Sequence, residues 1–443
     1  MSKLLLTFYG DDFTGSTDAL EQLTLAGIRT MLFIKLPSLR EIKKFPGLQA
    51  IGVAGLSRSL APQAQAKELR RYFRKFKMLR PRHVHYKVCS TFDSSPAIGS
   101  IGQAIDLGAS FFPGQFVPVL AAAPALGRYT VFGQHFARYG IGSAGQIHRL
   151  DRHPSISRHP VTPMTEADLT VHLGRQTKKR IGLFDILSVA RSKDEARAAL
   201  EKLIANKNKV ILFDAMSNEH ISRIGELLEE QAAVRSPLFS VGSSGIEAAL
   251  ATQFNGPQQS QKSVEPVSQI LVGSGSCSPV TSGQIAWALK HGFAEVAIDA
   301  GKLTGTRLAA AEIKRTTATT VALLQAGRSV IVHTTRHGSD KRVMAKLKGC
   351  TSLILGTALG KVMRKTIGQS PVRRLCIAGG DTSSFAARAL GIEALEMLAP
   401  LTPGAPLCRA HAPGSPVDGR EIVFKGGQVG AENYFETVLK GNS

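Results

Sequence analysis

The sequence has few cysteines and no long apolar run, and both shortages exclude classes of protein. No apolar segment reaches the roughly 18 residues that a membrane-spanning helix needs. The N-terminal LLLTFYG is too short for a secretory signal peptide. The five cysteines stand far apart, with no C-x-x-C pair, which favours reduced thiols over disulfides or a zinc site. We therefore expect a cytoplasmic protein with no membrane partner and no protein-bound metal.

Aromatic and acidic residues are also scarce. One Trp and six Tyr leave little material for the stacking platforms that bind single-stranded nucleic acid. With 55 Lys and Arg against 33 Asp and Glu, the net charge is +22. A positive field of this size attracts anions, and both nucleic acid and small anionic substrates are candidates.

The densest basic segment, residues 68–87, begins with the pattern of an amphipathic helix. Leu69, Tyr72, Phe73 and Phe76 fall on one stripe at helical spacing, and the charged residues fall elsewhere. A solvated helix face explains this pattern better than an anion-binding surface does.

Apolar runs of strand length alternate with longer stretches of helical periodicity. Strand candidates are residues 4–10, 30–34, 50–55, 83–88, 210–213, 238–242, 270–276, 295–299, 329–334 and 375–381. Helix candidates between them include residues 16–27, a stretch from about 280, and 306–326. The alternation predicts an α/β protein with largely parallel sheets flanked by helices.

A polar segment divides the chain. FNGPQQSQKSVEPVSQ, residues 254–269, contains two prolines and no periodicity, which is typical of a linker. A chain of 443 residues is also long for one core. We therefore expect two domains of unequal size, residues 1–255 and 269–443, joined by a linker over 256–268.

Two adjacent carboxylates end the first strand candidate. In YGDDFTGSTD, Asp11 and Asp12 precede a helical pattern, at the sheet edge where open α/β proteins bind ligands. The pair can accept hydrogen bonds from substrate hydroxyls, or one carboxylate can act as a general base. Ser16, Thr17 or Asp18 is expected to cap the helix. The simpler alternative is that the two aspartates only shape the turn.

A hydroxyl-rich loop follows the strand candidate at 83–88. It gathers Ser90, Thr91 and Asp93 in the stretch CSTFDSSP, a composition that suits a polyol. Lys87, just before the loop, is a candidate partner for a substrate carboxylate. A capped helix start with solvated serines is the alternative interpretation.

Three loops rich in glycine and serine join strands to helices in the second half. They are VGSGSCSPVTSGQ, IAGGDTSSF and KGGQVG, which begin at residues 272, 377 and 425. Three such junctions in one domain predict a nucleotide cradled by backbone amides and helix ends. The standard phosphate motifs are absent: GTALGKV at 356–362 is one residue short of a P-loop, and GSGSCS lacks the third glycine of a dinucleotide fingerprint.

Together these stretches resemble the four-carbon acid sugar kinase family, whose members phosphorylate tetronate-type sugar acids with ATP. The matching stretches follow the expected order over almost the whole chain: DDFTGSTDAL, SRS at 57–59, HPVTPM at 159–164, GSGSCSPVT, AGGDTS with RALGIEALE, PGAPL at 403–407 and KGGQVGAENYF. The resemblance implies an N-terminal sugar-binding domain and a C-terminal nucleotide-binding domain.

The resemblance also implies two sets of site residues. The substrate side is expected to comprise Asp11, Asp12, Arg58, Lys87 and Ser90, to which the hydroxyl-rich loop adds Asp93. Asp12 is the expected catalytic base, nearest the attacking primary hydroxyl. The ATP side is expected to comprise one or more of Ser274, Ser276 and Ser278, together with Gly379, Gly380, Asp381, Thr382, Gly426 and Gly427. Mg²⁺ would bridge the ATP phosphates.

Two stretches depart from the family pattern. Many members have Asp-Ser-Thr followed by Arg-Gly where this chain has CSTFDSSP, which indicates an oxo or branched acid such as 3-oxo-isoapionate in place of plain threonate or erythronate. Many also have Gly-Gly-Glu-Thr where this chain has Asp381 in place of the glutamate. That exchange keeps the charge, and we expect the ATP role to survive it.

The sequence therefore predicts an ATP-dependent kinase that phosphorylates the terminal hydroxyl of a small acid sugar, either a tetronate, an oxo-tetronate or a branched oxo acid. Two alternatives come from other classes. One is a basic protein that binds nucleic acid or another anion without catalysis, and the other is a sugar-acid dehydrogenase, which would need the missing dinucleotide fingerprint. We expect a homodimer whose partners are its acid sugar and ATP, with no nucleic acid.

Overall fold

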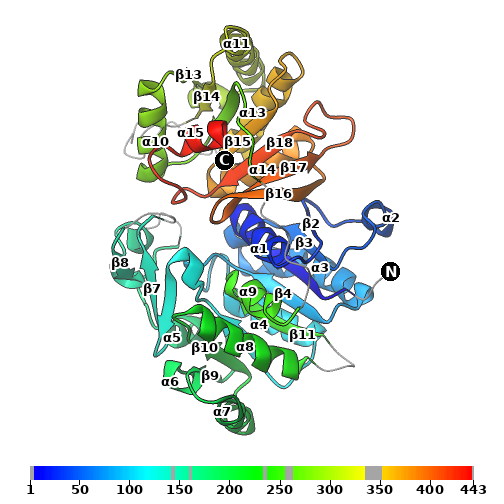
Figure 1. Ribbon diagram of the computed structural model, residues 1–443, viewed down its shortest axis with the longest axis vertical. Coiled ribbons are helices and arrows are strands. Elements are labelled where there is room, and N and C mark those ends of the chain that lie inside the picture. The colour runs from blue at the N-terminus through cyan, green and yellow to red at the C-terminus, as the bar shows by residue number, and fades with distance from the viewer. Residues whose placement is uncertain are drawn as a thin grey trace. The chain divides into compact units, whose positions relative to one another are not determined.

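A computed structural model describes residues 4–140, 145–158, 162–232, 237–254, 263–334 and 352–441. The chain divides into two compact units, which are described separately (Figure 1). The first unit takes Met1–Met31, Leu36–Tyr139 and Ala144–Gln259, and the second takes Leu32–Lys35, Gly140–Ser143 and Ser260–Ser443. No helix within the described ranges is long and apolar enough to cross a membrane.

The first unit is built on a parallel sheet with the strand order β3-β1-β4-β11-β5-β10-β9. Its strands are β1 (Leu6–Gly10), β3 (Ala50–Ala54), β4 (His83–Lys87), β5 (Val117–Leu120), β9 (Ile181–Phe184), β10 (Val210–Phe213) and β11 (Leu238–Gly242). Gly10 lies opposite Ala54 on one side and Lys87 on the other. The loops that follow β1, β3 and β4 therefore start at one edge of the sheet.

Nine α-helices of the first unit connect these strands. They are α1 (Phe13–Leu25), α2 (Leu39–Lys43), α3 (Pro62–Leu79), α4 (Ile101–Phe111), α5 (Leu169–Gly174), α6 (Ile186–Val189), α7 (Lys193–Ala205), α8 (Asn218–Gln231) and α9 (Gly245–Ala251), all within the described ranges. A small antiparallel sheet is inserted after β5, formed by β6 (Arg128–Val131), β7 (Gln134–Arg138) and β8 (Ile147–Arg149).

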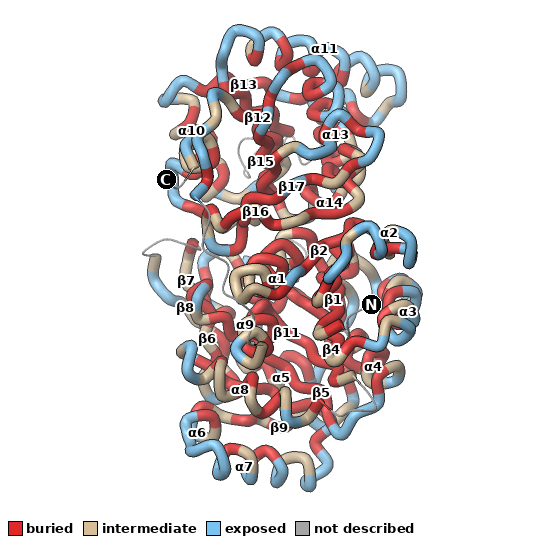
Figure 2. Tube along the Cα trace, turned by 45° about the vertical axis from the view of Figure 1, so that its right-hand side comes forward, coloured by how far each residue is buried: buried red, intermediate tan, exposed pale blue. Residues whose placement is uncertain are grey.

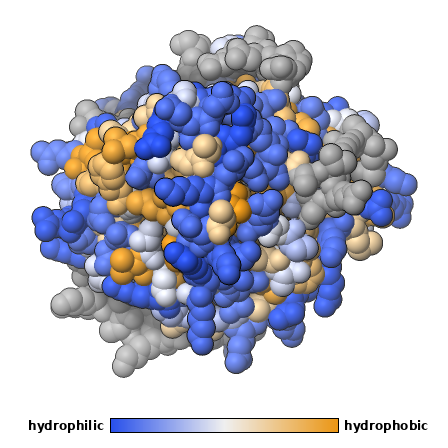
Figure 3. All heavy atoms as spheres, turned by 90° about the horizontal axis from the view of Figure 1, so that it is seen from below, coloured by the Kyte–Doolittle hydropathy of each residue, from blue (hydrophilic) through white to orange (hydrophobic). Residues whose placement is uncertain are grey.

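The core of the first unit lies between the sheet and its helices, where the tube of Figure 2 is coloured as buried. Leu69, Tyr72, Phe73 and Phe76 of α3 are all buried there, which confirms the predicted amphipathic helix. The outer helices turn polar faces to solvent. α7 buries only Ala196 and Leu200, and the face of the molecule in Figure 3 is largely hydrophilic with scattered apolar patches.

The second unit has a mixed sheet with the order β13-β14-β12-β15-β18-β17-β16. Its strands are β12 (Ile270–Ser274), β13 (Ala294–Ala297), β14 (Val330–His333), β15 (Arg374–Ala378), β16 (Ala394–Thr402), β17 (Ala405–His411) and β18 (Glu421–Lys425). The first five strands in this order are parallel, and the β16–β17 hairpin is antiparallel. At its far edge, Leu32 and Phe33, the end of β2 (Thr30–Phe33), pair antiparallel with β16.

Helices of the second unit include α10 (Pro279–Lys290), α11 (Thr306–Gln325), α13 (Ser352–Ile367), α14 (Gly380–Leu390) and α15 (Tyr434–Lys440). Two units, each with a largely parallel sheet and connecting helices, confirm the predicted α/β fold class. The hairpin and the small sheet of the first unit were not predicted.

Two stretches singled out in the sequence fall partly outside the described residues. Residues 159–161 of HPVTPM and residues 256–262 of the expected linker lie outside the described residues. The remaining linker residues, 263–268, carry no helix or strand, and Val264 among them is buried in the core of the second unit.

Candidate active site

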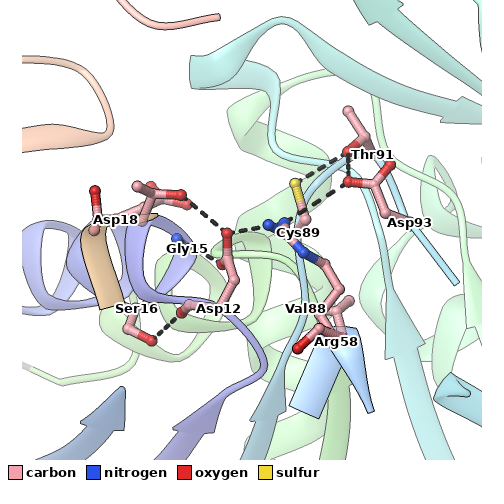
Figure 4. A network of polar contacts seen from close by, with 12 residues as sticks. Asp12, Gly15, Ser16, Asp18, Arg58, Val88, Cys89, Thr91 and Asp93 are labelled. Carbon is pink, nitrogen blue, oxygen red and sulfur yellow. Dashed lines mark hydrogen bonds and ion pairs between the residues drawn. The ribbon is translucent and has the colours of Figure 1, made fainter. Parts of the chain in front are cut away.

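The predicted substrate-side residues meet at the carboxyl ends of β1, β3 and β4. Backbone hydrogen bonds join their loops: the Asp11 amide donates to the Lys87 carbonyl oxygen at 2.8 Å, and the Arg58 amide donates to the Asp11 carbonyl oxygen at 3.1 Å. Arg58 lies in the short turn after β3. Figure 4 shows its side chain between the carboxylates of Asp12 and Asp93.

Asp12 uses both carboxylate oxygens in the structure. Oδ1 accepts from the Gly15 amide at 2.8 Å, and Oδ2 accepts from the Thr14 hydroxyl at 2.9 Å and lies 2.9 Å from Arg58 Nη1. Burial alone would raise the pKa of Asp12, but Arg58, Lys87 and these hydrogen bonds together hold the pKa below its ordinary value. Asp12 is therefore a stable anion in this state.

The helix cap was predicted wrongly. Ser16, Thr17 and Asp18 lie inside α1, and Asp12 is its N-cap. Asp12 has the extended backbone of a cap, with φ −136° and ψ 169°, and its side chain reaches the Gly15 amide. The helix begins earlier than predicted because a carboxylate at this position satisfies the exposed amides of the first turn.

Asp11 has a different environment from its neighbour. Its side chain is 2% exposed, and Oδ1 has no hydrogen-bond partner among the described residues. Burial, and then the negative charge of Asp12, raise the pKa of Asp11 well above its ordinary value. The two adjacent aspartates are thus electrostatically distinct: Asp12 is paired with a cation, and Asp11 has a buried oxygen without a hydrogen-bond partner in the described ranges.

The hydroxyl-rich loop closes the other side of Arg58. Asp93 Oδ2 lies 3.9 Å from Arg58 Nη1 and accepts a hydrogen bond from the Thr91 hydroxyl at 2.8 Å. Cys89 Sγ lies 3.0 Å from the same hydroxyl. Ser90 is nearly buried, and its carbonyl oxygen accepts from His135 Nε2 at 2.8 Å, which ties the loop to β7. The structure thus places all six predicted substrate-side residues in the loops and strand ends at this edge of the sheet.

Lys87, the last residue of β4, is buried with only 1% of its surface exposed. Its Nζ donates to the Val88 carbonyl oxygen at 2.9 Å and lies 3.5 Å from Asp18 Oδ2. Burial would lower the pKa of Lys87, but Asp18, Glu247 and Asp12 raise it above the ordinary value. The ammonium therefore stays charged at the base of the site.

The predicted ATP-side residues meet in the second unit. Three neighbouring strands end in register at Ser274, Ala378 and Lys425, so their three loops begin side by side. The Gly275 amide donates to the Ala378 carbonyl oxygen at 3.0 Å, and the Gly379 amide donates to the Lys425 carbonyl oxygen at 3.0 Å.

The glycines of these loops allow close packing. A Cβ atom placed on Gly427 would lie 2.9 Å from the Cβ atom of Ser278 and 3.3 Å from Ser276 Oγ. One placed on Gly379 would lie 3.2 Å from the Ser276 amide nitrogen, and the φ of Gly379 is +127°, a conformation that favours glycine. The Thr382 hydroxyl donates to the Gly275 carbonyl oxygen at 3.3 Å, which joins the first two loops.

Two helices start at these loops. Ser278 is the N-cap of α10, and α14 begins at Gly380 directly after Gly379. The hydroxyls of Ser274 and Ser278 are buried without a hydrogen-bond partner in the described part of the chain. Two helix N-termini beside hydroxyls without a partner in the described ranges suit a phosphate chain. The side chain of Asp381 lies outside what the structure describes.

Comparisons with known proteins agree with this geometry. A sequence model of a sugar-binding N-terminal domain matches residues 6–250, and one of a nucleotide-binding C-terminal domain matches residues 271–435. The chain is 42% identical to the 3-oxo-isoapionate kinase of Paraburkholderia graminis, over 99% of this chain and 94% of that protein.

The chain belongs to the four-carbon acid sugar kinase family. It is 30% identical to the 3-oxo-tetronate kinase of Cupriavidus necator, over 98% of this chain and 96% of that one. A solved structure of a Salmonella typhimurium LT2 protein has the same fold, with a TM-score of 0.76 at 23% identity and 98% coverage of both chains.

The protein is thus a kinase, a phosphotransferase with an alcohol group as acceptor. Its N-terminal part matches the sugar-binding domain model, and its C-terminal part matches the nucleotide-binding domain model. Nothing in the comparisons favours the nucleic-acid-binding or dehydrogenase alternatives.

Several polar groups around the predicted substrate-side residues were not predicted from the sequence. Asp18 was expected as a cap and is the ion-pair partner of Lys87. Thr14 was not singled out, although it lies in the DDFTG stretch and donates to Asp12. Glu247, in α9, is fully buried with its Oε1 3.6 Å from His85 Nε2. A polar residue inside an otherwise apolar helix pattern was the signal available for Asp18 and Glu247.

Proposed function

We propose that this kinase transfers the terminal phosphoryl group of ATP to the terminal hydroxyl of an oxo acid sugar. The branched acid 3-oxo-isoapionate is the first candidate, supported by 42% identity to a 3-oxo-isoapionate kinase over 99% of the chain. A 3-oxo-tetronate is the second candidate, supported by the relatives at 29% and 30% identity.

The observation that carries this proposal is that two cations, the buried Lys87 and the partly buried Arg58, lie at the same strand ends as two electrostatically distinct carboxylates. Arg58 and Lys87 provide positive charge at the strand ends, and Asp11 and Asp12 provide hydrogen-bond acceptors. An acid sugar presents the complementary groups, a carboxylate and several hydroxyls. The forked donors of an arginine suit a carboxylate especially well.

Arg58 also offers a means of activating Asp12. In the structure Arg58 binds Asp12 at 2.9 Å, and a substrate carboxylate would compete for the same guanidinium. Without that cation, the pKa of Asp12 would rise toward its ordinary value, and the carboxylate could accept the proton of the attacking hydroxyl. Asp11, with its unpaired Oδ1, would accept a hydrogen bond from a second hydroxyl.

The nucleotide side of the proposal rests on the three loops of the second unit. ATP fits them because the Gly427 position leaves no room for a side chain and because the Ser274 and Ser278 hydroxyls are buried without partners in the described ranges. Ser276, Gly379 and Thr382 would complete the cradle. Bound ATP would supply the phosphoryl group, with Mg²⁺ neutralising charge on its phosphates.

A coupled assay of ADP formation over a panel of acid sugars tests the proposal. The panel contains 3-oxo-isoapionate, a 3-oxo-tetronate, the corresponding hydroxy acids and the amide of one active acid. We expect turnover with the oxo acids and little with the amide, because the amide cannot pair with Arg58 or Lys87. A folded protein that forms no ADP with any acid on the panel would refute the proposal.

Three further expectations from the sequence stay predictions. The sugar-binding role of residues 1–255 and the nucleotide-binding role of 269–443, joined by the linker 256–268, are supported by the two matching domain models. A cytoplasmic location and a homodimer are the other two. Light scattering at micromolar concentration tests the dimer, and a monomer mass would contradict it.

A further inference from the structure

Lys425, the last residue of β18, is an unusual charged residue for the interior of a domain. Its side chain is 0% exposed, and within the described ranges no carboxylate forms an ion pair with it. Lysine is rarely buried completely unless it is paired, because removing an ammonium group from water is costly. A buried cation beside a phosphate-binding loop therefore calls for a functional explanation.

The ammonium group is held by a hydroxyl and an aromatic ring. Lys425 Nζ donates to Thr281 Oγ1 at 3.0 Å and lies 5.5 Å from the ring centroid of Tyr434. Thr281 Oγ1 in turn donates to the Gly427 carbonyl oxygen at 3.2 Å. An ammonium group can only donate, so it fixes the direction of the Thr281 hydroxyl and leaves its proton for Gly427.

This chain of hydrogen bonds ends at the nucleotide loops. Gly427 packs against Ser276 and Ser278, since a Cβ atom placed on it would lie 3.3 Å from Ser276 Oγ and 2.9 Å from the Cβ atom of Ser278. Lys425 also lies in register with Ala378 and, one strand further, with Ser274. The ammonium group and the unpartnered Ser274 hydroxyl thus belong to the same row at the carboxyl edge of the sheet.

Among the side chains that the structure describes, none near Lys425 supplies an anion to neutralise it. Thr281 of α10 does not titrate, and Tyr434 of α15 presents its ring. Cys376 of β15 is a buried thiol whose pKa is raised to about 12 by burial, so it is neutral near pH 7. Burial lowers the pKa of Lys425 to about 7. Its charge state therefore depends on what binds nearby.

We propose that Lys425 is a positioning residue of the nucleotide site, which holds the Gly426–Gly427 turn through Thr281 and takes up a proton when a phosphate chain binds at the three loops. The inference rests on the proposed binding of ATP at these loops. A bound triphosphate favours the ammonium form, and the ammonium form in turn orders the turn that contacts the nucleotide.

Proton uptake provides a readout that a purely structural lysine would not give. At pH 8, about nine-tenths of the free molecules would lack the proton if the pKa is about 7. Binding of MgATP should then take up close to one proton per site. Calorimetric titration at pH 8 in two buffers of different ionisation enthalpy measures this number directly, without turnover.

The variant Lys425→Met removes the charge and keeps an unbranched side chain of similar length. Replacing a buried charge by an apolar group is often neutral or stabilising, so the melting temperature without nucleotide should stay the same or rise. We expect the Kd for MgATP to rise about tenfold or more and proton uptake to disappear. The KM for ATP should rise more than kcat falls. Lys361→Met, at an exposed position of α13, is the matched control.

A second variant separates the hydrogen-bond chain from the charge. Thr281→Val should weaken MgATP binding, because Gly427 loses its donor, but it should leave proton uptake in place. Lys425→Met with wild-type affinity and wild-type proton uptake would overturn the inference, as would a wild-type protein that binds MgATP without taking up a proton. A folded wild-type protein that does not bind MgATP at all would instead refute the proposed nucleotide function.

Discussion

The substitution Asp12→Asn tests the sugar side of the kinase most sharply, because it changes the charge of one carboxylate and little else. Asparagine caps helices as well as aspartate does, so its carbonyl oxygen can still accept from the Gly15 amide at the start of α1. The amide group now faces Arg58 and the Thr14 hydroxyl, which both bind Oδ2 at 2.9 Å. The substitution therefore removes the ion pair and the proton acceptor together.

The expected losses follow from these contacts. A hydrogen bond to a charged group contributes about 1.5–3 kcal/mol, and the free energy of unfolding should fall by that amount at pH 7. If Asp12 accepts the proton of the attacking hydroxyl, kcat should fall by ~10²-fold or more, which corresponds to about 2.7 kcal/mol of transition-state stabilisation. The Kd for ATP should not change.

Asp11→Asn is the matched control at the neighbouring position. Its Oδ1 has no hydrogen-bond partner among the described residues, so kcat should fall little. The KM for the acid sugar should rise because a hydroxyl-binding group serves ground and transition states alike. Steady-state kinetics and urea denaturation of both variants show which of the two carboxylates is the base. Equal and small effects would mean that the pair only shapes the turn, and a collapse of kcat at Asp11 alone would make Asp11 the base.

The pH dependence of stability distinguishes the two carboxylates independently. The pKa of Asp12 is lowered on folding, so its contribution is present above the ordinary value of 3.8 and is lost as the pH falls through the folded-state pKa. The pKa of Asp11 is raised on folding, so above pH 3.8 the unfolded state loses its proton first and folding must restore it; the wild type therefore loses stability as the pH rises from 3.8. Asp11→Asn should therefore gain stability relative to wild type between pH 4 and pH 7.

Two other predictions concern single side chains at the two sites. Gly427→Val should raise the Kd for MgATP and leave the KM for the acid sugar unchanged, because a side chain at this position meets Ser278. The control is Gly283→Val, which has open space around it. If thermal-shift titrations give Gly427→Val the same affinity for MgATP as the wild type, the loop assignment is wrong. Lys87→Met should destabilise the protein by about 3–5 kcal/mol by leaving Asp18 buried and unpaired. The double variant with Asp18→Asn should regain stability in urea denaturation but should not regain activity. If its activity does return, Lys87 has no role in substrate binding.

Most strands of the two parallel sheets could be predicted, because each is a short apolar run with loop residues at both ends. β5 and β9 were not among the strand candidates. The β16–β17 hairpin could not. Pro400 lies inside β16 and Pro406 inside β17, and a proline inside an apolar run argues against a strand unless the position is at an edge or a bulge. The β16–β17 pairing shifts register on both sides of Ala399, a long-range irregularity that no local pattern contains.

The site was predictable as a set of loops and not as a set of contacts. The carboxyl ends of parallel strands lie at one edge, so Asp11, Asp12 and Lys87 could be placed together from the sequence. The pairing of Arg58 with Asp12 joins residues from two strand ends, and its geometry depends on the sheet register. Lys425 was overlooked because a lysine at a strand end is normally solvated, and only the packing shows it buried.

The most direct test of the central claim is a phosphorus NMR spectrum of the reaction mixture with ATP, Mg²⁺ and 3-oxo-isoapionate. We expect one new phosphomonoester for each ADP formed, with its signal split into a triplet by two protons of a terminal carbon. No such ester should form when the acid sugar is left out, and it should form more slowly by ~10²-fold or more when Asp12→Asn replaces the wild type. Inorganic phosphate as the only new product, or ADP formation without the acid sugar, would contradict the account.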